Sequence, residues 1–391
     1  MTSTYDPRSP QARADPYPLY RAMREHDPVQ HLSSANLWFL TRHVDCLAML
    51  RDHRFSASHG QHLRRGALPV SMLTSDPPEH TRLRHAVAPA FDGRAMRRVR
   101  GWLAACVDAR LRCACAALAA GDELDVAADL ARPLAAAVLA RFLGLPNEEL
   151  PRFAGWGQAV AVNLDPFADP GADDRAAPAM AAMLDRFADH LHARVTDPRD
   201  DAFSVLALGH ASGKLTAEEV LAATALLVVG GLEPLADMVG NAAAALLEQP
   251  VPSASPRMRP RTVVDELLRF DPPIQFTART AMEDVIVGGR KVGRGDSVVA
   301  LLGAANRDPA RFTGPDVLRL DRRTNPHLAF GAGPHTCLGA PLVRLVGELL
   351  LDRVWAWLPS LRWGGSPAVR RAGVVPRGYR HLPVRCVQDQ P

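Results

Sequence analysis

The residues with the clearest chemical pattern surround Cys337, in the segment "HLAFGAGPHTCLGAPLVRLVGELLL". A helical pattern begins directly after this cysteine. A cysteine just before a helix N-terminus has its thiolate stabilised by the helix dipole and by free backbone N–H groups. Glycines on both sides let the backbone turn tightly and approach a flat group closely. The segment therefore predicts a metal-binding thiolate presented by a glycine-rich loop.

Six positions of this segment fit the pattern F-G-x-G-x-H-x-C-x-G: Phe330, Gly331, Gly333, His335, Cys337 and Gly339. A thiolate in this setting is a good axial ligand for haem iron. The alternative is a buried free cysteine in a glycine turn. Six matched positions strongly favour the ligand.

A second chemically unusual stretch is "LLVVGGLEPLADMVGNAAAALL", which has the apolar bulk of a long buried helix. Gly230 and Gly231 lie near its middle, followed by Glu233 and Pro234. Glycine costs about 1 kcal/mol in a helix interior and proline about 3 kcal/mol. Proline also clashes with the carbonyl four residues earlier, here Gly230, so we expect an opened helix at this point. An acid at such a kink favours a role in proton transfer, although it could instead face solvent or cap a neighbouring segment.

A third pattern is the pair Glu266 and Arg269 in "DELLRFDPP". Residues three apart lie on one helix face, where they can form a hydrogen-bonded ion pair. Such pairs are common on helix surfaces. Only the position of this pair upstream of Cys337 makes it informative.

The elements that must hold these residues are mostly helices. Alanine- and leucine-rich helical patterns follow from about Arg94, whereas strand patterns are few, chiefly "EDVIVGGRKVGRGDSVVALLG" and "HLPVRCV". No convincing linker or repeat divides the chain. We expect a single domain over residues 1–391, mainly α with minor β.

Composition excludes several classes. The chain has 391 residues, of which 46 are Lys or Arg and 42 are Asp or Glu, so its charge is too small to indicate nucleic-acid binding. Among six cysteines there is no C-x-x-C pair, which argues against structural zinc. No signal peptide or membrane span is evident. We expect a cytoplasmic protein that binds no membrane.

Together these motifs resemble the cytochrome P-450 family, specifically its soluble bacterial members, over nearly the whole chain. The resemblance implies a fold in which a long distal helix and the cysteine-ligand loop sandwich haem b (iron protoporphyrin IX). Cys337 would ligate the iron, within a loop formed by Phe330, Gly331 and Gly339. Two propionates need several cationic or N–H partners. The resemblance assigns this role to His80, Arg84, Arg279 and His335.

The resemblance also interprets the other two motifs. Glu266 and Arg269 would form a structural triad with Arg322 or Arg323, of which Arg322 is the better match. The family's distal helix usually reads A/G-G-x-D/E-T-T/S, so Gly230, Gly231 and Glu233 match, while Pro234 replaces the usual threonine. The missing hydroxyl predicts atypical proton delivery, in which Glu233 with water, or a polar group of the substrate, replaces the alcohol.

We expect an apolar substrate pocket for a mid-sized organic molecule, formed by four segments, 56–72, 160–171, 228–235 and 274–277, with a further turn at 374–378. Its candidate lining residues are Val229, Leu232, Ile274, Phe276 and Val375. The resemblance implies a monooxygenase, with hydroxylation or epoxidation in specialised-metabolite (antibiotic) biosynthesis. The alternatives are oxidative coupling, ring closure or desaturation and, less favoured, a non-catalytic relative that activates a partner.

The chain has no flavin or iron–sulfur motif, so electrons must come from elsewhere, and the resemblance implies that they come from NAD(P)H through partner proteins. The resemblance implies a ferredoxin and a ferredoxin reductase, and it leaves open a carrier-protein-bound substrate. Because ferredoxins are acidic, a basic docking face is expected, with candidates Arg97, Arg98, Arg100 and Arg344. Each of these could equally belong to an ordinary charged helix face.

Overall fold

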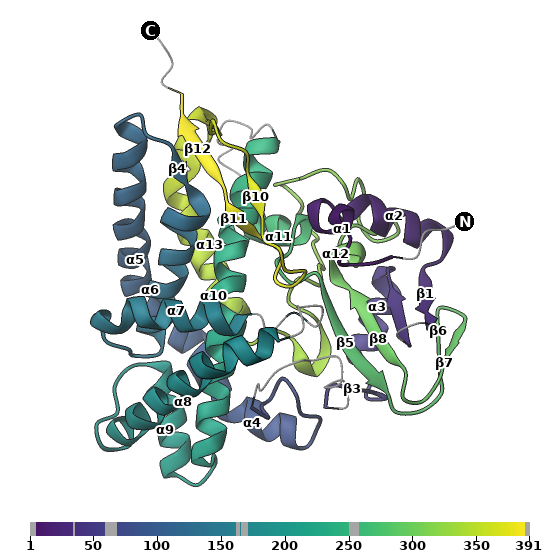
Figure 1. The fold of residues 1–391 in the computed structure, drawn as a ribbon, viewed down its shortest axis with the longest axis horizontal. Helices are drawn as coiled ribbons and strands as arrows, with labels where there is room; N and C mark the ends of the chain where they lie inside the picture. Colours follow the sequence, from purple (N-terminus) through teal and green to yellow (C-terminus); the bar gives the residue numbers. More distant parts are fainter. Residues whose placement is uncertain are drawn as a thin grey trace.

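The structure is a computed structural model that describes residues 5–33, 36–58, 69–161, 165, 171–249 and 258–387. Helices dominate it, as expected, and gather in one half of the molecule, while the largest sheet lies in the other half (Figure 1). The helices are α1 (Pro10–Ala14), α2 (Tyr17–His26), α3 (His43–Arg51), α4 (Glu79–Val87), α5 (Gly93–Ala119), α6 (Arg132–Phe142), α7 (Leu150–Val160), α8 (Ala172–Thr196), α9 (Ala202–Ala211), α10 (Ala217–Glu248), α11 (Pro260–Phe270), α12 (Leu302–Ala305) and α13 (Ala340–Val354).

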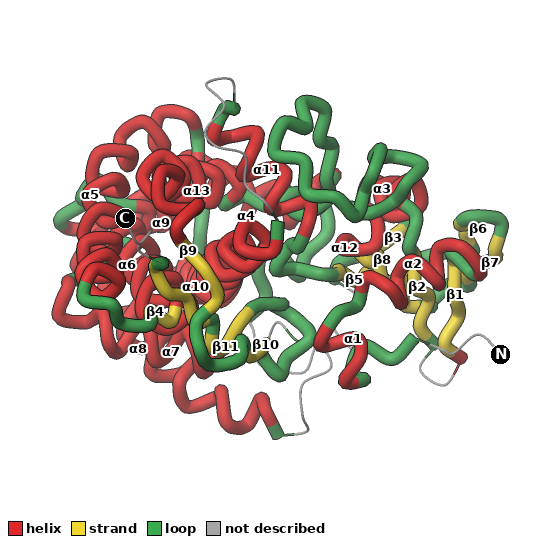
Figure 2. The backbone as a smooth tube through the Cα atoms, turned by 90° about the horizontal axis from the view of Figure 1, so that it is seen from above, coloured by secondary structure: helices red, strands yellow, loops and turns green. Residues whose placement is uncertain are grey.

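The largest sheet has the strand order β1-β2-β8-β5-β3, in which only the β2–β8 pair is parallel. Figure 2 shows its strands beside α2, α3 and α12, away from the helical half. Three small sheets have the strand orders β4-β12-β9, β6-β7 and β10-β11. The strands are β1 (Val29–Leu32), β2 (Leu37–Leu40), β3 (Phe55–Ser56), β4 (Leu124–Asp125), β5 (Phe276–Ala281), β6 (Val285–Val287), β7 (Arg290–Val292), β8 (Ser297–Leu301), β9 (Leu361–Trp363), β10 (Val369–Arg370), β11 (Tyr379–His381) and β12 (Pro383–Cys386).

Helix α10 is the central element of the helical half and packs against α6, α7, α8, α9 and α11. It begins at a capping box, in which Thr216 accepts from the N–H of Glu219 and the Glu219 carboxylate accepts from the N–H of Thr216. By length and composition α10 could span a membrane, but 61% of its most apolar window is buried inside the protein. Its apolar surface is therefore accounted for by the core.

The proline that predicted an opened helix, Pro234, lies within α10. The helix continues through this proline without a break from Ala217 to Glu248. Proline removes a single N–H donor, and the loss concerns only the bond to the Gly230 carbonyl. On either side, Leu232 and Leu235 are buried in the main core. Packing of these flanking side chains keeps the backbone helical despite the missing bond.

Candidate active site: the Cys337 loop and helix α10

The loop that carries Cys337 is shaped by its glycines. Gly331 and Gly333 have φ values of +66° and +70°, a region that glycine adopts without strain. A Cβ atom on Gly333 would also collide with the backbone carbonyl of Leu50. The Cys337 N–H then donates to the Phe330 carbonyl at 2.8 Å, which closes the loop immediately before α13.

The Cys337 side chain is exposed on one side and enclosed by protein on the others. This enclosure raises the pKa of the thiol, while the backbone N–H groups of Gly339 and Ala340 and the charges of Arg84 and Arg344 lower it. These N–H groups belong to the start of α13, as the sequence predicted. These N–H groups and arginine charges act together with a bound metal cation to favour the thiolate form of Cys337.

The four residues predicted to bind anionic groups beside the cysteine come together in the structure. The rings of His80 and His335 lie 4.1 Å apart. Both ring nitrogens of His80 are buried and have no hydrogen-bond partner within the described residues. Burial, together with the charges of Arg279 and His80, lowers the pKa of His335 to about 3. Burial also lowers the pKa of Arg84, while its interaction with Cys337 raises it. These groups would gain most from an anion placed among them.

Arg279 belongs to the same cluster, but unlike His80 it has hydrogen-bond partners within the protein. Its Nη1 donates to Thr277 Oγ1 at 3.1 Å and to the Ala278 carbonyl at 2.7 Å. Its side chain is buried on strand β5. Sequence analysis therefore selected two histidines and two arginines that form one positively polarised cluster.

Glu266 and Arg269 form a fully buried ion pair, with two donor–acceptor distances of 2.8 Å. Arg322 Nε also donates to Glu266 at 3.0 Å, so the structure places Arg322 in the third position. Asn325 Nδ2 donates to the same carboxylate at 3.1 Å, a contact that sequence analysis missed. Because Arg322 and Asn325 precede the Cys337 loop, this carboxylate anchors the segment that leads into it.

On α10, Gly230 is exposed and Pro234, one turn later, is half-buried. Glu233 is 1% exposed. Its side chain projects in a different direction from Pro234, since consecutive helix residues lie on different faces. Gly231 faces α6, because a Cβ there would come within 3.0 Å of Leu139. The carboxylate and the proline therefore occupy different faces of the helix.

Glu233 forms an ion pair with Arg371, which lies between β10 and β11. Asp237, one turn along the helix, is 3.8 Å from the same guanidinium. Burial raises the pKa of Asp237 well above its usual value, and Glu233 is the nearer of the two carboxyl groups to Arg371. Burial and the charge of Arg132 lower the pKa of Arg371 to about 10. Sequence analysis missed Arg371 because no local pattern connects it to α10.

The predicted substrate-lining residues are distributed unevenly. Val229 and Leu232 are buried in the main core, where Leu232 packs against Gly157 of α7. Phe276 is buried on β5 and Ile274 is half-buried beside it. Val375 lines a cavity of about 630 Å³. Of the predicted pocket segments, residues 59–68, 162–164 and 166–170 lie outside the described residues.

The predicted docking arginines also differ from one another. Arg97 and Arg100 are exposed on α5. Arg98 pairs with Asp200 at 3.0 Å. Arg344 pairs with Asp265 at 2.6 Å and lies over the Phe330 ring at 4.6 Å, so its charge is already used within the protein.

These observations test whether the site suits a haem. A thiol at a helix N-terminus can ligate iron, and the His80 and Arg84 cluster offers unsatisfied donors for propionates. Gly230 on α10 is exposed and carries no side chain that would block a flat group. The residues therefore fit this cofactor, and fold and site together define a haem-thiolate oxidoreductase.

Comparison with known proteins agrees. Residues 261–354 match the profile of the family Cytochrome P450. Nocardicin C N-oxygenase of Nocardia uniformis subsp. tsuyamanensis is 37% identical, with 95% of each chain covered. The crystal structure of CalO2 is 32% identical with a TM-score of 0.89, covering 98% of this chain and 99% of that one. P450BioI, solved in complex with hexadec-9Z-enoic acid ligated acyl carrier protein, is 29% identical with a TM-score of 0.86, covering 96% and 100%.

The chain belongs to the cytochrome P450 family and is a P450 monooxygenase. The family binds haem and receives electrons from redox partners. Other relatives carry names from polyketide and biotin biosynthesis, so the chain groups with bacterial P450s of biosynthetic pathways.

Proposed function

We propose that this P450 hydroxylates or epoxidises a mid-sized organic substrate as a tailoring step in specialised-metabolite biosynthesis. The observation that carries the proposal is the Cys337 thiol at the start of α13 beside the cluster of His80, Arg84, Arg279 and His335. When bound, haem b supplies reductive activation of dioxygen, and the thiolate favours O–O cleavage. The similarity to Nocardicin C N-oxygenase supports a biosynthetic substrate.

In this proposal the enzyme is cytoplasmic and electrons reach it from NAD(P)H through a reductase and a ferredoxin. The exposed Arg97 and Arg100 on α5 support an acidic protein partner. The structure of P450BioI with a loaded acyl carrier protein supports a carrier-bound substrate as one possible form. No nucleic acid or membrane takes part.

The proposal assigns proton supply to Glu233. Pro234 leaves the Gly230 carbonyl without an N–H partner, and this exposed carbonyl can hold a water molecule. Glu233 is adjacent in sequence, buried, and paired with Arg371, which lines the 630 Å³ cavity. A proton can thus pass from the cavity side to the carboxylate and on through water. A polar group on the substrate is the alternative donor.

A second candidate function is oxidative coupling, ring closure or desaturation. The observation that favours it is Pro234, because the residue lacks the hydroxyl that normally assists proton delivery. Product mass separates the candidates, since monooxygenation adds one oxygen atom and desaturation removes two hydrogens. A non-catalytic role is disfavoured because the candidate thiolate, Cys337, is present.

The cofactor assignment is tested by the carbon-monoxide difference spectrum of the reduced protein. We expect the long-wavelength Soret band of a thiolate-ligated haem, and its loss in Cys337→Ser and Cys337→Ala. Retention of the band in both variants would refute Cys337 as the ligand.

The proton-supply assignment is tested by Glu233→Gln. We expect slower turnover and a larger share of NAD(P)H diverted to peroxide, because the variant cannot release a proton. Glu218→Gln, at an exposed position on the same helix, is the matched control and should leave coupling unchanged. Unchanged coupling in Glu233→Gln would contradict the role, and little gain from Pro234→Thr would indicate a donor on the substrate.

A further inference from the structure

The cavity of about 630 Å³ lies between α7, α8, the first turns of the chain and the segment joining β10 to β11. It is large enough for a small organic molecule. Its charged lining is one-sided, with five arginines and one carboxylate among the described residues: Arg13, Arg132, Arg175, Arg371, Arg380 and Asp165.

The one carboxylate does not balance these charges. Asp165 accepts from the Val374 N–H at 2.6 Å and so holds the loop backbone. Within the described part of the chain, Arg13, Arg132, Arg175 and Arg380 form no ion pair. Among the described residues, Arg371 is the one arginine of the cavity lining that has a carboxylate partner, Glu233.

Two of these arginines are partly enclosed. The Nε of Arg13 is buried and lacks an acceptor among the described residues. Arg132 donates to the carbonyls of Tyr379 and Arg380 at 2.9 and 3.0 Å, which satisfies hydrogen bonds without neutralising charge. Placing several arginines together with so few negative charges is unfavourable unless an anion binds among them. Guanidinium groups also match the geometry of carboxylate and phosphate oxygens.

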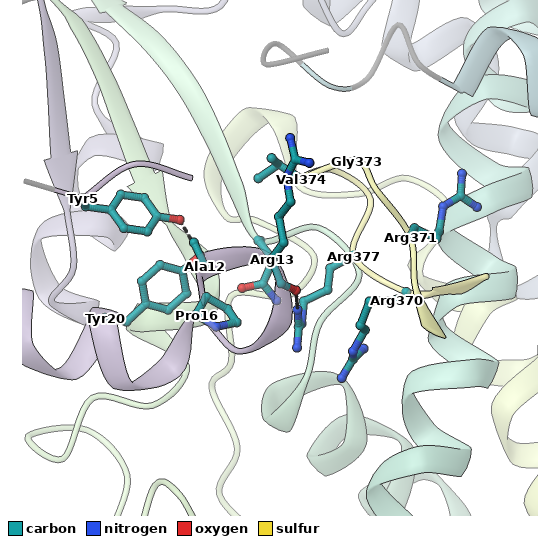
Figure 3. A pocket seen from close by; sticks show the side chains of 12 residues that line it. Tyr5, Ala12, Arg13, Pro16, Tyr20, Arg370, Arg371, Gly373, Val374 and Arg377 are labelled. Atoms are coloured by element: carbon teal, nitrogen blue, oxygen red, sulfur yellow. Dashed lines mark hydrogen bonds between the residues drawn. The ribbon is translucent and has the colours of Figure 1, made fainter. Parts of the chain in front are cut away.

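The cavity adjoins the proposed reaction centre. Figure 3 draws a neighbouring pocket that shares Arg13, Arg371 and Gly373 with this cavity. In this view Arg371 is directed away from Arg13 and Arg377, towards the helices beside it. Its partner there is Glu233 of α10, next to Pro234. Val375, on the same loop, lines the cavity as well. A ligand in this cavity therefore contacts the arginine that is paired with Glu233 of α10.

We propose that the substrate carries an anionic oxygen group, a carboxylate or a phosphate, which binds in this arginine-lined cavity while its apolar part extends towards α10. The inference rests on the proposed function, because it names the substrate class of that site. A free carboxylic acid and the phosphate of a carrier-bound substrate share this chemistry. The concave shape favours a ligand group over a flat protein surface.

The experiment measures binding of three probes with the same alkyl chain, dodecanoate, dodecyl phosphate and dodecanol, to the haem-loaded protein. Calorimetry gives the dissociation constants, and the Soret shift reports arrival at the haem. We expect at least one anion to bind about tenfold or more tightly than dodecanol. This preference should shrink as salt rises from about 50 to about 500 mM. The tighter of the two anions identifies the natural oxygen group.

The decisive variant is Arg175→Gln/Arg380→Gln, which removes two exposed charges outside the catalytic residues. We expect about tenfold weaker binding of the preferred anion and unchanged binding of dodecanol. The matched control is Arg112→Gln/Arg385→Gln, which removes one exposed helix arginine and one exposed strand arginine outside the cavity lining.

Equal binding of anions and dodecanol by the wild-type protein, or equal losses in both double variants, would overturn the inference. The wild-type salt dependence provides this test even where a variant folds poorly. Failure of the proposed function is seen separately, as absence of the thiolate Soret band, whereas calorimetry reports the cavity in either case.

Discussion

The buried carboxylate of Glu266 provides the sharpest test of what holds the site together. It accepts five hydrogen bonds, two from Arg269 and one each from Arg322, Asn325 and the Arg319 N–H. Glu266→Gln keeps the volume but replaces one oxygen with a donor that faces guanidinium groups. Breaking a buried ion pair typically costs about 3–5 kcal/mol.

Other contacts of Arg269 narrow the expected loss of stability in Glu266→Gln. Arg269 also donates to the carbonyls of Asn306, Pro315 and Val317, so part of its environment survives the substitution. We therefore expect the lower end, about 3 kcal/mol, a large share of a stability that is typically about 5–15 kcal/mol. Haem retention should fall as well, because Glu266 anchors the segment leading to Cys337.

The assay is chemical denaturation followed by tryptophan fluorescence, with the haem content measured on the same preparations. Glu25→Gln, at an exposed position on α2, is the control and should change stability by less than about 0.5 kcal/mol. If the stability change in Glu266→Gln were as small as that of the control, the buried network would not stabilise the protein, and the reasoning would be refuted.

Two further perturbations follow. Gly333→Ala should destabilise the protein and reduce haem binding, because the φ of Gly333 is +70° and a Cβ there would meet the Leu50 carbonyl. The control Gly101→Ala lies on open helix surface and should be neutral or stabilising in the same denaturation assay. Burial alone would raise the pKa of Asp271, but Arg377 and other basic neighbours lower it overall. The ionised Asp271 therefore stabilises the folded protein above about pH 4, and this contribution is lost as the pH falls through the lowered pKa. Asp271→Asn should flatten this acid limb, and an unchanged limb would contradict the assignment.

Local patterns were enough to predict the elements that carry the site. The helical pattern after Cys337 gave α13, and the glycine spacing gave the loop before it. The two strand patterns formed β6, β7 and β8 in the first segment and β12 in the second. In each case the decisive interactions are between residues close in sequence, so single-sequence reasoning can detect them.

Contacts between distant segments were not predictable in this way. The pairing of Glu233 with Arg371 depends on how the β10–β11 segment lies against α10. Asn325 binds Glu266 for the same reason. Helix α10 continues through Pro234, since tertiary packing outweighs a local propensity. The motif thus identified the acid but not the charge that balances it.

Arg371 connects the two parts of the proposed mechanism. Its guanidinium pairs with Glu233, and the same side chain lines the cavity proposed for the anionic group. Asp237 lies farther from this guanidinium than Glu233 does, and burial raises its pKa well above the usual value. An anion in the cavity must therefore share Arg371 with Glu233, which weakens the hold of that cation on the carboxylate and favours its protonation. Binding of an acidic substrate would in this way prepare the proton donor that Pro234, lacking a hydroxyl, cannot replace.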